Sequence, residues 1–188
     1  MLTAQSKRKE NIAEYILYLW QLEDLLRALK FSPKDIFAHL IEPFEGLDQM
    51  QQQDILIWYM DIINLLREEG KEQNGHLDHT MHLIDDMNNL HLQLLKFPIG
   101  ADYRAVYSNV EAEIPGMKER LGRKDMSDVE LFMKALYAVV LLRIKNKGND
   151  NDPYINDVMT LISPVVAALA DMYRKVETGE VDLYKGMD

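Results

Sequence analysis

Apolar residues recur every three or four positions along almost the whole chain, and this spacing restricts the possible folds more than any other feature. In a helix of 3.6 residues per turn, such a repeat places the apolar side chains on one face. No pair of segments alternates apolar and polar residues around a hairpin turn, so no β-sheet is predicted. The sequence therefore predicts an all-α fold.

Prolines, glycines and capping residues divide the chain into six or seven predicted helices. Pro115 and Gly116 predict an interruption of the fifth helix, and Pro164 predicts a bend in the seventh. The 188 residues contain no long linker, so we expect a single-domain bundle over 1–179 and a frayed tail over 180–188. The predicted helices span 4–30, 33–43, 48–70, 75–97, 101–121, 127–148 and 152–177.

Composition argues against several classes of function. The formal net charge of −10 repels phosphate backbones and anionic headgroups, so we expect no nucleic-acid partner and no membrane partner. The absence of cysteine excludes disulfides, thiolate zinc sites and cysteine nucleophiles. The first residues, MLTAQSKRKENIAEY, carry charges where a signal peptide needs an apolar stretch. These features together favour a cytoplasmic location.

Two charged residues project onto apolar helical faces. Glu23 falls among the leucines of the first helix, and Arg143 falls in the middle of the apolar face of the sixth. An unpaired buried charge costs several kcal/mol, so the simplest hypothesis is that Glu23 and Arg143 pair with each other. The alternative is that each long side chain reaches solvent at the rim of the bundle.

Two histidines also fall on apolar faces. His91 shares the face of the fourth helix with Met87 and Leu94, and His76 points toward the core at the start of that helix. A lone histidine in such a position is usually a core residue bonded to a carbonyl. A role as a ligand or proton-transfer group needs a carboxylate from another helix, and Glu23 is of the right type. Glu23, His76, His91 and Arg143 are therefore the candidate buried polar cluster.

A run of histidines and aspartates raises the question of a metal site. His76, His79 and His82 follow one another at steps of three, and Asp86 comes one turn later. Each step of three rotates the side chain by about 60°, so the three rings spread over about 120° of the helix surface. His79 with His82, or His82 with Asp86, could supply only two ligands. We therefore expect a solvated face, and no metal or other cofactor is predicted.

One family resemblance covers essentially the whole chain. The segment KRKENIAEYILYLWQLEDLLRAL resembles the opening of a family of uncharacterised all-helical proteins from Bacteroidetes, a domain of unknown function. The similarity continues through REEGKEQNGHLDH, DMNNLHLQLLK and ALYAVVLLRIKNK. The resemblance implies a bacterial, cytoplasmic helical bundle. It implies no activity, cofactor or catalytic residue.

The favoured functional hypothesis is a non-enzymatic protein that acts through contacts with an unidentified protein partner or as a homodimer. This hypothesis predicts an exposed apolar strip of a few hundred Å2. The seventh predicted helix is the expected place for it. The residues of the predicted strip are Val158, Leu161, Ile162, Val165, Val166 and Leu169.

The alternative hypothesis is a small-molecule or metal-dependent enzyme of the hydrolase type. Its pocket would lie between the first, fourth and sixth predicted helices and would be lined by Glu23, His91 and Arg143. The carboxylate and the imidazole would act as acid–base groups, and the guanidinium would bind an anion. A regulatory role with a basic partner is a third possibility, which the sequence does not rank against the other two.

Overall fold

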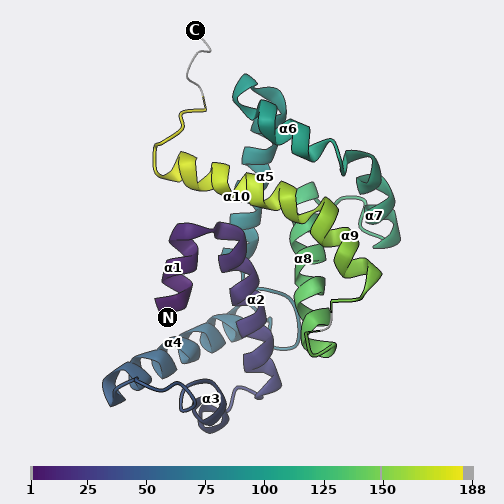
Figure 1. Ribbon diagram of the computed structural model, residues 1–188. Coiled ribbons are helices and arrows are strands. Elements are labelled where there is room, and N and C mark those ends of the chain that lie inside the picture. The colour runs from purple at the N-terminus through teal and green to yellow at the C-terminus, as the bar shows by residue number, and fades with distance from the viewer. Residues whose placement is uncertain (1, 149, 184–188) are drawn as a thin grey trace.

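The computed structural model describes residues 2–148 and 150–183, and these residues form only helices, turns and loops (Figure 1). The all-α prediction is therefore confirmed for the described part of the chain. The helices are α1 Leu2–Glu10, α2 Ile12–Ala28, α3 Pro33–Leu40, α4 Gln49–Glu68, α5 Asp78–Lys96, the 3-10 helix η1 Pro98–Gly100, α6 Ala101–Tyr107, the 3-10 helix η2 Glu111–Glu113, α7 Ile114–Arg120, α8 Asp128–Lys145, α9 Pro153–Leu161 and α10 Ser163–Glu177.

Three predicted helices are each divided, which explains why the α-helices outnumber the six or seven predicted. The first breaks at Asn11, which has an extended backbone and whose side chain accepts hydrogen bonds from the amides of Ala13 and Glu14. An asparagine that caps a new helix in this way competes with continuation of the old one. The predicted fifth helix is interrupted before Pro115, which occupies the first turn of α7. The predicted seventh helix is divided at Ile162, where α9 ends and α10 begins.

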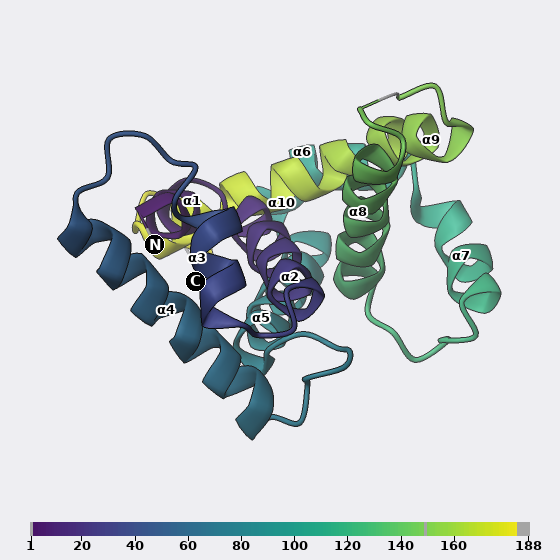
Figure 2. The same cartoon turned by 90° about the horizontal axis from the view of Figure 1, so that it is seen from below.

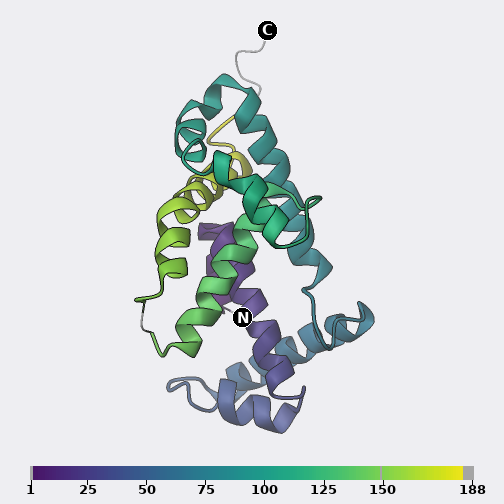
Figure 3. The same cartoon turned by 90° about the vertical axis from the view of Figure 1, so that its right-hand side faces the viewer.

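The main core lies among α2, α5, α8 and α10, each of which contacts the other three (Figure 3). Trp20 of α2, Met87 of α5, Phe132 of α8 and Leu169 of α10 are buried there. A side chain of this size stabilises the fold by about 1.5–3 kcal/mol when it is fully buried. The four helices therefore form the rigid body that positions the shorter ones.

A second, smaller core joins the C-terminal half of α2 to α3 and α4. Its fully buried members are Leu26, Ile36, Ile41, Ile63 and Leu66. The long helix α4 packs mainly against α2 and α3, and Figure 2 shows it along one side of the molecule, opposite α7 and α9. In the described part of the chain, one long face of α4 is consequently exposed.

The apolar strip predicted on the seventh helix is not exposed. Of its six residues only Leu161 is half-buried, and the other five are buried. The prediction is wrong because the segment breaks into α9 and α10, and α10 packs onto α2, α5, α6 and α8. The same segment, Pro153–Glu177, is long and apolar enough to cross a membrane by length and composition. Its apolar side is the part that the neighbouring helices cover.

Residues 180–183 follow the end of α10 and form no helix. The rest of the tail predicted to fray, 184–188, lies outside the described residues.

Candidate functional site

Glu23 is buried on α2 and binds the loop that leads into α5. Its Oε2 lies 2.8 Å from His76 Nδ1 and 3.9 Å from Arg27 Nη2, and its Oε1 accepts a hydrogen bond of 3.3 Å from the Leu77 amide. The predicted pairing of Glu23 with Arg143 is therefore wrong. The partners of this carboxylate come from a loop, which helical periodicity does not place.

Aromatic rings enclose the imidazole of His76. It stacks on the indole of Trp20 with ring centroids 4.0 Å apart, and Tyr137 of α8 meets it edge-on at 5.5 Å. The Tyr137 hydroxyl donates hydrogen bonds to the Trp20 carbonyl at 3.0 Å and to Asp24 Oδ2 at 2.5 Å. Burial, and then the hydrogen bond to the Asp24 carboxylate, raise the pKa of Tyr137. The cluster thus fastens α2, α8 and the loop before α5 to one another.

Arg27 holds the same loop from its other end. The guanidinium donates to the carbonyls of Lys71, at 3.0 and 3.2 Å, and Gly75, at 2.5 Å, and it pairs with Asp24 at 2.7 Å. These bonds fix the loop in place, and α5 begins at Asp78 instead of at the predicted residue, Gly75. The cluster around Glu23 is a structural clamp, because its polar groups satisfy one another.

His91 belongs to a different cluster, near the N-terminus of α8. Its Nδ1 lies 2.6 Å from the Tyr103 hydroxyl, and its Nε2 lies 3.7 Å from Asp128 Oδ2. The Tyr107 hydroxyl donates to Asp128 Oδ2 at 2.8 Å, and Lys118 Nζ lies 2.6 Å from Oδ1. His91, Lys118 and Tyr107 together hold the pKa of Asp128 well below its usual range. The carboxylate that His91 meets is therefore Asp128, not Glu23.

The predicted site residues thus do not converge. Arg143 lies near the outer end of α8, and it binds Asp150 with Nε–Oδ1 and Nη2–Oδ2 distances of 3.0 and 2.9 Å. The pocket lined by Glu23, His91 and Arg143 is absent from the described residues. Within that part of the chain, every buried side-chain nitrogen or oxygen atom has a hydrogen-bond partner.

Replacing Arg143 with alanine should change the free energy of unfolding by less than about 1 kcal/mol. The guanidinium and its partner Asp150 are both substantially exposed, and exposed ion pairs contribute about 0.2–1 kcal/mol. Urea unfolding of the two proteins checks this. A loss of several kcal/mol would instead place Arg143 in a buried pair.

The weak metal candidates lie on the surface. His79, His82 and Asp86 are exposed on α5, and His79 Nε2 is 3.2 Å from the Tyr15 hydroxyl. No group of three histidine, aspartate or glutamate residues in 2–148 or 150–183 is arranged to hold a metal ion.

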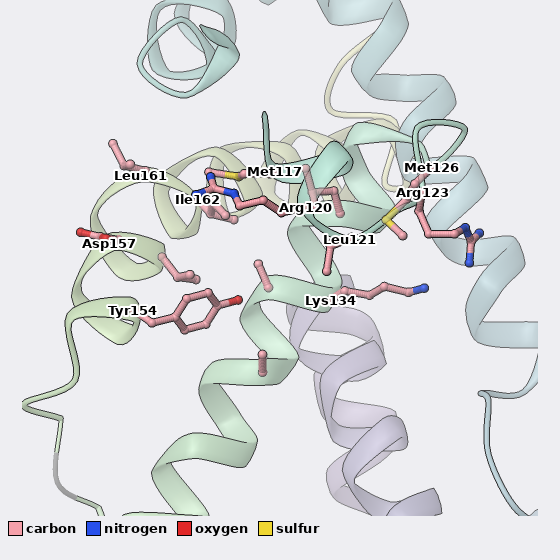
Figure 4. Close-up of a pocket in the computed structure, with 14 residues that line it drawn as sticks. Met117, Arg120, Leu121, Arg123, Met126, Lys134, Tyr154, Asp157, Leu161 and Ile162 are labelled. Carbon is pink, nitrogen blue, oxygen red and sulfur yellow. The ribbon is translucent and has the colours of Figure 1, made fainter. Parts of the chain in front are cut away.

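An apolar groove of about 620 Å3 lies between α7, α8 and α9 (Figure 4). Two small residues of α8, Ala135 and Ala138, leave the space that forms its floor. Leu121 and Tyr154 stand on opposite sides with 55% and 42% of their surface exposed. The other apolar side chains that line the groove are Met117, Met126, Leu131, Val158, Leu161 and Ile162.

The charged residues of the groove are mostly cations. Arg120, Arg123 and Lys134 line it, together with the single acid Asp157. In Figure 4 the Arg120 side chain reaches toward Ile162, whereas the ends of Arg123 and Lys134 point away from the groove. Arg120 donates to the Gly116 carbonyl and forms no ion pair within the described chain. Most of the groove lining is apolar, with charged groups at Arg120, Arg123, Lys134 and Asp157.

Comparison with known proteins identifies one family. The family model described as "Domain of unknown function (DUF4924)" matches residues 1–180. The chain belongs to this family. No curated protein and no solved structure matches the chain. The family assignment agrees with the resemblance seen in the sequence and carries no activity with it.

Sequence reasoning missed the groove of this DUF4924 member, and it missed Asp128 as the partner of His91. One signal was available for the groove, because Ala135 and Ala138 are small residues three positions apart on an otherwise bulky helix. Asp128 gave no separate signal, since an acid in the first turn of a helix is ordinary. Its role depends on α6 and α7 meeting the start of α8.

Proposed function

We propose that this member of the DUF4924 family is a non-enzymatic protein that binds a helix of a protein partner through the groove between α7, α8 and α9. The observation that carries this proposal is the apolar lining, with Leu121 and Tyr154 exposed on its two sides. Exposed apolar surface of this kind marks interaction sites, and an amphipathic helix commonly fills such a groove.

The two polar clusters support this reading over an enzymatic one. An acid–base site needs titratable groups that face a space large enough for a substrate. Glu23 and His91 are buried and bonded within separate clusters, and Arg143 lies apart from both. The enzyme alternative therefore lacks the converging residues on which it was based.

The proposed setting is the cytoplasm of a Bacteroidetes bacterium. A chain without cysteine suits a reducing compartment, and the resemblance to uncharacterised Bacteroidetes proteins favours the same setting. The net charge of −10 makes nucleic acid and anionic membranes poor partners, which leaves protein surfaces as the favoured ones.

Site-specific cross-linking tests the groove directly. Because the chain has no cysteine, Ala138→Cys introduces a single thiol in the groove, and Ala105→Cys places one on the exposed face of α6 as a matched control. A benzophenone at residue 138, but not at residue 105, should capture one protein in cell lysate. That protein, once purified, should bind the wild-type chain at least about tenfold more tightly than the Ala138→Glu variant.

Two results would contradict the proposal. Equal capture from the two positions, together with unchanged affinity of the captured protein for Ala138→Glu, would show that the groove is not the binding surface. Native mass spectrometry of the untagged protein gives the other test. A stoichiometric small molecule that is lost in Ala138→Glu would make the groove a small-molecule site.

A further inference from the structure

The free face of α4 is both apolar and acidic. Met50, Ile57 and Leu65 are exposed by 74%, 52% and 44%. Acidic residues alternate with them, and at 100° per residue all six fall within about 80° of the helix circumference. The acidic members of this face are Asp54, Asp61 and Glu68.

The three acids of this face have no side-chain partner among residues 2–148 and 150–183. Within the described residues, Asp54, Asp61 and Glu68 form no ion pair and no hydrogen bond through their side chains. The neighbours of α4 are α2 and α3, which cover its other side. The face is thus an amphipathic, negatively charged helical surface that α2 and α3 do not cover.

The groove between α7, α8 and α9 is apolar and carries cations, so it complements the apolar and acidic face of α4. Its floor is apolar at Ala135 and Ala138, and Arg120 is a cation without a carboxylate partner in the described chain. Arg123 and Lys134 add positive charge at the rim, although each already meets a neighbouring acid. The lining carries three cations against the single acid Asp157, which in a chain of net charge −10 is a local excess of positive charge that favours an acidic partner.

We propose that the helix bound in this groove is α4 of a second copy of the chain. Ile57, with Met50 and Leu65 about two turns away on either side, would pack on the alanine floor, and Asp54 and Asp61 would face Arg120. Figures 1 and 2 place α4 on the opposite side of the molecule from α7 and α9, two of the helices that line the groove, so one chain cannot fill its own groove. This inference rests on the proposed role of the groove as a helix-binding site.

The contact is heterologous, because the two surfaces that meet are different. Each copy carries one α4 face and one groove, so copies either close into a symmetric assembly or extend head to tail. The 20-residue α4 is about 30 Å long and about 10 Å wide, so one face offers on the order of 300 Å2 in projection. Stable interfaces bury about 800 Å2 per partner, so association should be weak, with a Kd in the micromolar range or above.

Sedimentation velocity of the full chain tests the proposal. The weight-average mass should rise between about 1 μM and about 1 mM protein, and added salt should reduce the rise because the rim charges are screened. Ile57→Glu and Ala138→Glu should each weaken association at least about tenfold. Ala105→Glu, an equivalent change on the exposed face of α6, should leave it unchanged. Circular dichroism of each variant confirms that it is folded.

Mixing Ile57→Glu with Ala138→Glu, the two variants with weakened self-association, gives the sharper test. The Ile57→Glu chain keeps an intact groove and the Ala138→Glu chain keeps an intact α4 face, so the mixture should form one-to-one dimers and nothing larger. A monomer at every concentration, or self-association that neither substitution changes, would overturn the inference. So would association that depends on residue 138 but not on residue 57.

Failure of the assignment to α4 is distinguishable from failure of the proposed function of the groove. If the chain stays monomeric while a different protein, captured at residue 138, binds less tightly to Ala138→Glu, the groove is a protein-binding site and only its assignment to α4 is wrong. If no protein, the chain itself included, depends on residue 138, the proposed function fails as well.

Discussion

Replacing Glu23 with alanine should lower the free energy of unfolding by about 3–5 kcal/mol. The change removes the acceptor for the His76 imidazole and for the Leu77 amide in a buried place, and loss of one partner of a buried pair typically costs this much. Urea unfolding at neutral pH, followed by tryptophan fluorescence, measures the loss, because Trp20 stacks directly on His76.

The matched control is Glu14→Ala on the same helix. Glu14 forms an exposed ion pair with Lys7, so its removal should cost less than about 1 kcal/mol. Glu23→Gln should fall between the two, because an amide oxygen can still accept the hydrogen bond from Leu77. Similar losses for Glu23→Ala and Glu14→Ala would show that the clamp is not formed.

The second large effect concerns Asp128. Asp128→Asn should destabilise the protein by about 2–3 kcal/mol at neutral pH, because His91, Lys118 and Tyr107 all meet this carboxylate. Its pKa in the folded protein is lowered relative to the unfolded chain. The stabilisation is therefore present above the ordinary pKa of about 4 and is lost as the pH falls through the lowered folded-state value.

The pH dependence of the free energy of unfolding distinguishes the effect of the Asp128 charge from the effect of its side-chain shape, which Asp128→Asn preserves. The wild-type protein should lose stability steadily below about pH 4, and Asp128→Asn should lose less over the same interval because the group no longer titrates. Asp125→Asn is the control, because Asp125 is exposed and its ion pair with Arg123, at 3.4 Å, is exposed as well. Parallel stability curves for the wild-type protein and Asp128→Asn would mean that Asp128 is not stabilised in its charged form.

The parts of the fold that depend on local chemistry could be predicted from the sequence. Ser32, Asp48, Ser127 and Asp152 stand at or directly before the predicted starts of four helices, and each caps the helix that follows it. Each cap is a side chain bonded to an amide two or three residues away, so the signal lies within a few positions of sequence. Asn11 is the same kind of cap, but it was hidden inside a continuous helical pattern.

The parts that depend on distant contacts could not be predicted. Helical projection placed Glu23 and His91 on buried faces, and both are buried. Their partners come from the loop before α5 and from α6 and α8, whose positions follow from the packing of several helices. Arg143 shows the opposite error, because it lies in the last turn of α8, where its side chain is 40% exposed and pairs with the exposed Asp150.

The course of α2 has a consequence for synthesis on the ribosome. The helix contributes to both cores, but its partners in the smaller core, α3 and α4, are complete by residue 68. Its partners in the main core include α8 and α10, which begin only at residues 128 and 163. Because chains emerge N-terminus first, the smaller core can assemble while the apolar side of Ile12, Ile16 and Trp20 still lacks most of its cover. The nascent chain therefore exposes an apolar helical face until α8 and α10 have been translated, and this interval is when a chaperone would be needed most.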